Sequence, residues 1–186
     1  MTAVDDISLI RRMAARDQSA MNALYARHNV RVYRFLVRLT RIEATAEELM
    51  NEVFLEAWRR AGSFEGRSSV STWLMAIAHH RAVSALRKRR ETALDDVTAA
   101  GIADGDDTPE VTAQKRSKAA VMRACMDRLS PDHRAIIDLV YYHDKSVAEA
   151  AGIAGIPENT VKTRMFHARK KLAELMREAG IDRGWP

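Results

Sequence analysis

Apolar residues recur at every third or fourth position through much of this chain, a spacing that predicts amphipathic helices rather than strands. In residues 44–61 and 160–172 they fall within one arc of a helix that turns by about 100° per residue. The arcs consist of Met50, Val53, Phe54, Ala57 and Ala61 in the first segment and Val161, Met165, Ala168 and Leu172 in the second. A further helix is expected in "STWLMAIAHHRAVSALRKRR", so the pattern predicts an all-α fold.

Cap residues divide the carboxy-terminal part of the chain into short helices. Ser130 is an expected N-cap, because a proline follows it at the first helical position. Ser146 and Glu149 fit a capping box, Gly155 would end that helix, and Pro157 would start the next one. Two short helices separated by "AGIP" have the spacing of a helix-turn-helix.

The distribution of charge indicates how these helices are grouped. The net charge is +7 in residues 1–90, −7 in residues 91–112 and +5 in residues 113–186. We therefore expect two small basic helical domains, residues 1–90 and 113–186, joined by a flexible acidic linker, residues 91–112. An alternative is that the linker folds back onto a basic face of one domain.

Composition excludes several classes of function. No signal peptide is recognised and no apolar run approaches the roughly 20 residues that cross a bilayer, so a cytoplasmic protein without membrane insertion is expected. Cys125 is the single cysteine and lies between apolar residues, where burial is expected. Neither a phosphate-binding glycine loop nor a nucleophile motif is found, and the neighbouring His79 and His80 diverge by about 100° on a helix. We therefore expect no enzymatic activity, no cofactor and no metal.

The face of helix 160–172 opposite its apolar arc is typical of a DNA-reading helix. It carries Thr163, His167 and Lys170 beside Phe166, and cations flank it on both sides. Short polar side chains reach base edges, an aromatic ring contacts a thymine methyl, and cations bind phosphates. An ordinary cationic surface helix is the alternative, which the preceding capped helix and turn make less favourable.

The amino-terminal segments indicate a second kind of partner. In helix 44–61, Leu55 lies among charged residues, which fits either a tolerated surface leucine or the apolar anchor of a docking surface. The following loop contains Phe64, and the next helix places Trp73, His80, Ser84 and Arg87 on one face. These aromatic rings belong either to the core or to a surface on which unpaired bases stack.

Together these segments resemble the sigma-70 family, specifically its extracytoplasmic-function group. The family's second region is matched by "ATAEELMNEVFLEAWRR", "FEGRSSVSTWL" and the helix ending in "LRKRR". Its fourth region is matched by "LSPDHRAIIDLVYYHDKSVAEAAGIAGIPENTVKTRMFHARKKL". The resemblance departs at His80, where the family usually has asparagine, and at Ser84, where aspartate is common.

The resemblance implies a sigma factor that binds core RNA polymerase, directs it to promoter DNA and helps to melt the promoter under the control of an anti-sigma factor. The implied polymerase-binding residues are Glu47, Glu48, Asn51, Glu52 and Leu55. The implied −10 residues are Phe64, Arg67, Ser68, Trp73, His80, Ser84 and Arg87. The implied −35 residues are Thr160, Lys162, Thr163, Arg164, Phe166, His167, Arg169 and Lys170.

The length of the linker is compatible with this interpretation. About 25 base pairs place the two promoter elements about 85 Å apart, and a 22-residue linker with two domains can span that distance. By resemblance the linker would thread the RNA channel of the polymerase, where its acids would imitate a nucleic-acid strand. A helix-turn-helix repressor that never meets polymerase is the rival interpretation, but it gives the surfaces around Leu55 and Trp73 no task.

Overall fold

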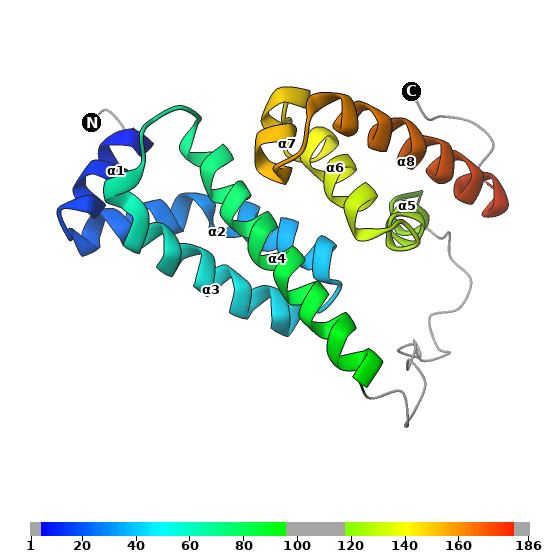
Figure 1. The fold of residues 1–186 in the computed structure, drawn as a ribbon, viewed down its shortest axis with the longest axis horizontal. Helices are drawn as coiled ribbons and strands as arrows, with labels where there is room; N and C mark the ends of the chain where they lie inside the picture. Colours follow the sequence, from blue (N-terminus) through cyan, green and yellow to red (C-terminus); the bar gives the residue numbers. More distant parts are fainter. Residues whose placement is uncertain (1–4, 96–117, 181–186) are drawn as a thin grey trace.

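Every regular element in the described part of the chain is helical, as predicted. The computed structural model describes residues 5–95 and 118–180 (Figure 1). The elements are α1 (Asp6–Ala14), α2 (Gln18–Thr40), α3 (Glu43–Arg60), the short 3-10 helix η1 (Ala61–Ser63), α4 (Val70–Asp95), α5 (Lys118–Asp127), α6 (Pro131–Tyr141), α7 (Val147–Ala154) and α8 (Glu158–Glu178).

Helices α1 to α4 form an amino-terminal bundle. Asp5 and Asp17 accept backbone hydrogen bonds at the starts of α1 and α2, which satisfies amide groups that have no partner within the helix. Phe35 and Phe54 are completely buried, as is Leu74 of α4. The predicted apolar arc of residues 44–61 faces this core, with Met50 packed at its edge. Burial of this apolar surface is the main force that holds the four helices together.

Helices α5 to α8 form the carboxy-terminal bundle, and its predicted caps are confirmed. The Ser130 hydroxyl accepts the backbone N–H of His133. Ser146 and Glu149 form both bonds of a capping box. Gly155 ends α7 with φ +65°, a left-handed conformation that glycine adopts without strain. Pro157 occupies the N-cap position, so α8 begins one residue later than predicted.

The predicted core arc of α8 is also confirmed. Val161, Ala168 and Leu172 are fully buried, and Met165 is half-buried. The carboxy-terminal half of α8 packs with α5 in a separate apolar cluster. This cluster includes Cys125, which is buried as expected. These contacts orient α8 so that its polar face points away from the bundle.

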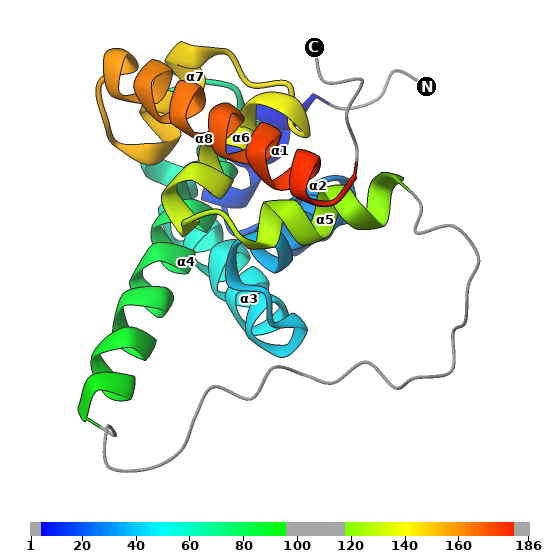
Figure 2. The same cartoon turned by 90° about the vertical axis from the view of Figure 1, so that its right-hand side faces the viewer.

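The two bundles pack directly against each other. Helix α7 lies against α4 and α6 lies against α2, and one apolar core continues from Phe35 and Leu39 into Ile136 and Leu139 (Figure 1). Helix α4 is longer than predicted and runs through Asp95, with its carboxy-terminal half extending from the bundle (Figure 2). The first five residues of the predicted linker are therefore helical. Residues 96–112, with the predicted role in the RNA channel, lie outside the described residues.

Candidate functional site

Helix α8 follows the turn after α7 and lies on the outside of the carboxy-terminal bundle (Figure 1). Its exposed side carries a cationic face. The exposed side chains on it are Lys162, Thr163, Phe166, His167, Arg169 and Lys170. Phe166 is 60% exposed, an unusual position for a phenylalanine without a partner to cover it. Its ring lies edge-on to that of His167 with centroids 5.4 Å apart. The two rings and the surrounding cations form one continuous surface.

Three side chains of the predicted −35 set are held by neighbours. The guanidinium of Arg164 pairs with Asp132 at the start of α6, at 2.9 Å, and Arg169 donates to the hydroxyl of Tyr141 at 3.4 Å. The Thr163 hydroxyl donates to the carbonyl of Asn159 within α8, at 2.9 Å. It therefore presents its methyl group and an acceptor lone pair outward. Thr160 is half-buried at the base of the helix.

A second surface of the predicted set surrounds the loop between η1 and α4. Phe64 and Trp73 are both half-buried, and their rings pack together with centroids 5.0 Å apart. They lie at the rim of the core, so part of each ring packs against protein and part is accessible to solvent. Gly66 has φ +71° and turns the loop, leaving Arg67 and Ser68 fully outside. Arg67 pairs with Glu65.

The remaining predicted −10 residues lie along α4. His80, Ser84 and Arg87 are all exposed, and Arg87 approaches Glu91 at 3.8 Å. Trp73 therefore shares α4 with this polar stripe, whereas Phe64 lies in the loop before the helix.

The predicted docking surface lies on the outer side of α3. All five of its members, Glu47, Glu48, Asn51, Glu52 and Leu55, are exposed. Leu55 is 52% exposed, so it remains available as an apolar anchor. Arg81 of α4 holds the carboxylates of Glu52 and Glu56 at 3.2 and 2.6 Å, which fixes one edge of the surface.

Helix α2 lines a groove beside these residues that was not predicted from the sequence. A groove of about 570 Å³ separates α2 from α3, and Tyr25, Val30 and Tyr33 line its α2 side opposite Glu47 and Asn51. Val30 is 55% exposed. Its position between Asn29 and Arg31 on a polar stripe was the available signal, since an isolated apolar residue there has no place in the core.

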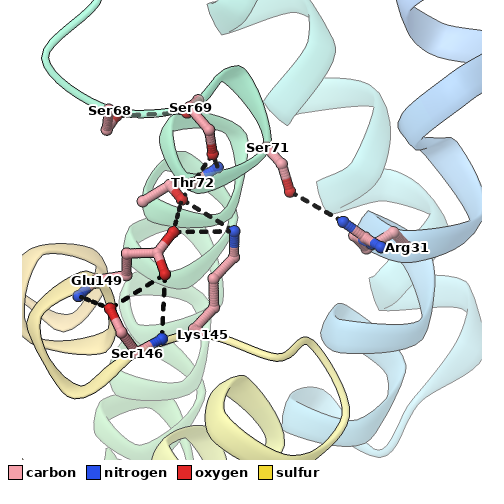
Figure 3. A network of polar contacts seen from close by, with 8 residues as sticks. All are labelled: Arg31, Ser68, Ser69, Ser71, Thr72, Lys145, Ser146 and Glu149. Carbon is pink, nitrogen blue, oxygen red and sulfur yellow. Dashed lines mark hydrogen bonds and ion pairs between the residues drawn. The ribbon is translucent and has the colours of Figure 1, made fainter.

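A polar network joins the two bundles close to Trp73 (Figure 3). The Thr72 hydroxyl donates to Glu149 at 2.7 Å and accepts a hydrogen bond from the Lys145 ammonium at 2.9 Å. Lys145 also lies 3.4 Å from the same carboxylate. The bond from Thr72, followed by that from the Ser146 backbone, lowers the pKa of Glu149 to about 2.

Comparison with known proteins assigns the family. Residues 24–92 match the model for sigma-70 region 2, and residues 119–172 match the model for sigma-70 region 4. The ECF RNA polymerase sigma factor SigL of Mycobacterium tuberculosis is 31% identical over 175 residues, which cover 91% of this chain and 96% of SigL. The chain belongs to the extracytoplasmic-function (ECF) sigma factors. SigM of the same organism is 34% identical to this ECF sigma factor over 172 residues, covering 92% of this chain and 84% of SigM.

Solved structures show the same fold. The sigma factor RpoE of Bartonella quintana, in complex with the anti-sigma factor NepR, has a TM-score of 0.70 and 25% identity, covering 87% of this chain and 98% of RpoE. CnrH, in complex with the cytosolic domain of CnrY, has a TM-score of 0.68 and 22% identity, covering 93% of this chain and 97% of CnrH. The prediction of a sigma-70 family protein of the ECF group with two helical domains is therefore confirmed.

The described residues hold neither a metal cluster nor a membrane span. Within residues 5–95 and 118–180, no three His, Cys, Asp or Glu side chains gather where they could hold an ion. None of the helices described is both long enough and apolar enough to cross a bilayer.

Proposed function

We propose that this ECF sigma factor binds core RNA polymerase in the cytoplasm, carries it to promoters and helps to open them, by binding rather than by catalysis. The observation that supports this best is the presence of separate exposed surfaces of different chemistry on one chain. The face of α8 is cationic with exposed rings, whereas that of α3 is acidic with one exposed leucine. A repressor that acts alone needs the first surface and has no use for the second.

The α8 face reads the −35 element in this proposal. The exposed rings of Phe166 and His167 and the methyl of Thr163 reach base edges in the major groove, while Lys162, Arg169 and Lys170 contact the phosphates on either side. Arg164 acts from its ion pair with Asp132, which fixes the direction of its guanidinium before DNA arrives. Thr160 lies in the first turn of α8, next to the sugar–phosphate backbone of the DNA in this proposal.

The loop after η1 and the exposed stripe of α4 capture the −10 element in this proposal. Stacking of an unpaired base on an aromatic ring stabilises by about 1–3 kcal/mol, comparable to the cost of unstacking it from the duplex. Phe64 and Trp73 support each other's ring positions, and Arg67, Ser68 and Arg87 are placed to contact the strand's phosphates. His80 and Ser84 set the base preference from α4. Thermal opening is trapped without nucleotide hydrolysis.

The α3 surface docks on core polymerase. Leu55 is the apolar anchor, and Glu47, Glu48, Asn51 and Glu52 form its polar rim. An anti-sigma factor controls access to these surfaces. Support for that control comes from two solved relatives, one in complex with the anti-sigma factor NepR and the other with the cytosolic domain of CnrY.

Single substitutions with matched controls test each surface. Lys162→Ala should weaken binding of the sigma factor, in complex with core polymerase, to a duplex with a −35 element. It should also lower the slope of log affinity against log salt by about 1, because one phosphate contact is lost. Lys171→Ala is the control, since Lys171 lies on the same helix but pairs with Glu174 at 3.6 Å. Equal affinities for the two variants would contradict the assignment of the reading face.

Polymerase docking is tested with Leu55→Asp against Ile7→Asp. Both leucine and isoleucine are about half exposed, but Ile7 lies on α1, outside the proposed surface. Pull-down of core polymerase should be lost with the first variant alone. Initiation from a fork-junction template then tests the whole proposal. Tight binding of intact duplex without polymerase, and no effect on initiation, would favour the repressor instead.

A further inference from the structure

Helix α6 packs against α8, and each of its two ends holds one arginine of that helix. At the start of α6, the carboxylate of Asp132 pairs with the guanidinium of Arg164 at 2.9 Å. At the end of α6, the hydroxyl of Tyr141 accepts a hydrogen bond from Arg169 at 3.4 Å. The two tethers differ in chemistry, because a carboxylate carries a negative charge and a tyrosine hydroxyl is neutral.

The two arginines lie on opposite flanks of the proposed reading face. A helix turns by about 100° per residue, so Arg164 lies at about 300° and Arg169 at about 80° from Val161 in the buried arc. Between them lie Thr163 and His167, at about 200° and 240° on the exposed side. Side chains on the flanks of a helix in the major groove face the phosphates of the two strands. Each arginine is therefore placed at one wall of the groove.

The ion pair with Asp132 restricts the directions in which Arg164 can donate hydrogen bonds. Its Nη2 is held by Oδ2 of Asp132, and its side chain is only 28% exposed. The guanidinium is planar and has five N–H donors, and those not held by Asp132 have no hydrogen-bond partner among the described residues. These donors can meet a DNA acceptor only when α8 lies at a particular depth and angle in the groove.

The carboxylate of Asp132 also offsets the positive charge of this flank. Burial, followed by Arg164 and His167, lowers the pKa of His133, whereas Asp132 acts in the opposite direction. Asp132 lies in the first turn of α6, where the helix dipole stabilises a negative side chain. Since its side chain is 54% exposed, it also meets any phosphate that approaches Arg164. Such a phosphate must compete with a carboxylate that is already in place.

We propose that Asp132 is a specificity-determining residue, which restrains Arg164 so that this arginine assists binding at a −35 element but adds little to the binding of other DNA. This inference rests on the proposed function of the α8 face. Cations that pair with phosphates in any docking pose strengthen binding to every sequence alike, and so lower the selectivity. An arginine that exchanges a carboxylate for a phosphate gains less than one that exchanges only water. Asp132 acts through Arg164 and makes no contact with a base.

Asp132→Asn tests the proposal, because it keeps the shape of the side chain and removes its charge. Affinity is measured by fluorescence anisotropy for the sigma factor in complex with core polymerase, over a range of salt concentrations, with core polymerase alone as the baseline. One labelled duplex carries the −35 element, and a second carries the same bases in scrambled order. Thermal unfolding by circular dichroism verifies that each variant is folded.

The substitution is expected to raise the affinity for the scrambled duplex by roughly fivefold to tenfold at about 0.1 M salt, because Arg164 gains a phosphate contact. The slope of log affinity against log salt should become steeper by about 1 for that duplex. Affinity for the −35 duplex should change little, so that selectivity falls by the same factor. An unchanged ratio of the two affinities would overturn the proposal.

Two further variants separate the role of Asp132 from that of net charge. Asp132→Glu keeps the carboxylate and should retain the selectivity of the parent protein. Glu178→Gln is the matched control, because it also removes one negative charge and frees an arginine, Arg128, from an ion pair of 3.1 Å at the other end of α8. It should leave selectivity unchanged. An equal loss of selectivity in Glu178→Gln and Asp132→Asn would overturn the proposal, since net charge alone would then explain the effect.

Action through Arg164 is tested by repeating Asp132→Asn in an Arg164→Ala background. The gain in affinity for the scrambled duplex should largely disappear there, because the two residues act as a pair. A gain as large as that in the parent background would show that Asp132 acts without Arg164, and would overturn the proposal. If the parent complex itself does not prefer the −35 duplex, the proposed function of the α8 face fails instead. The two failures are therefore distinguishable.

Discussion

Replacing Arg134 with methionine should separate the contribution of its guanidinium from that of its apolar stem. The guanidinium donates to five backbone carbonyl oxygens, and its bonds to Leu39, Met126 and Leu129 are fully buried. A buried polar group left without a partner costs about 1–3 kcal/mol. The variant also avoids the desolvation of a cation, and burial does lower the pKa of Arg134, which shows that the site disfavours its charge. We expect a net loss of about 4 kcal/mol, within the range for breaking a buried charged contact.

For a protein of this size that loss corresponds to a fall in Tm of about 8–16 °C, measured by far-UV circular dichroism. Arg134→Lys should fall in between, since an ammonium has three donors and cannot serve five acceptors. Arg123→Met is the control, because Arg123 is exposed and lines the same pocket. It should change the unfolding free energy by less than about 0.5 kcal/mol. A Tm for Arg134→Met within 2 °C of that control, taken here as about 1 kcal/mol or less, would refute this account of the buried guanidinium.

Three further predictions concern pH and glycine. Burial, with Arg164 and His80 nearby, lowers the pKa of His79 below 6.5, so the contribution of the neutral ring to stability should be lost as pH falls below about 6.5. The unfolding free energy of His79→Gln, measured by denaturant titration, should therefore depend less on pH in that range than that of the parent protein. Equal pH dependence of the two proteins would contradict this. The lowered pKa of Glu149 implies a further loss of stability as pH falls from 4.5 towards 2. Glu149→Gln should make this loss smaller, and an acid unfolding transition identical to that of the parent protein would disprove it. Gly152→Ala should raise the unfolding free energy by about 0.5–1 kcal/mol, because the added methyl group meets open space in a helix. Gly155→Ala should lower it, because the backbone there has φ +65°. Effects of the same sign would refute this.

The helix-turn-helix was predictable from sequence because its determinants are local. A hydroxyl at an N-cap, a glutamate three residues later and a glycine in the left-handed region act within one or two turns of helix. Ser146, Glu149 and Gly155 therefore carry the same information in the sequence and in the structure. The apolar arc of α8 followed from helical periodicity for the same reason.

Contacts between the bundles were not predictable, because they depend on partners far apart in the chain. Lys145 looks like an ordinary loop lysine until α4 covers it, and Thr72 looks like a helix-start threonine until Glu149 accepts its hydroxyl. The same applies to Phe64 and Trp73, for which the sequence left core and surface roles open. The structure places both rings at the rim of the core, where they are half-buried, and base stacking on them stays a prediction.

The interface between the bundles combines a continuous apolar core with buried polar contacts. An interface built from apolar groups alone would be at least as stable, since a buried ion pair seldom stabilises more than well-packed apolar side chains of the same size. Arg38, Arg134 and Lys145 instead dictate one way of docking, because each has partners in the other bundle only in this arrangement.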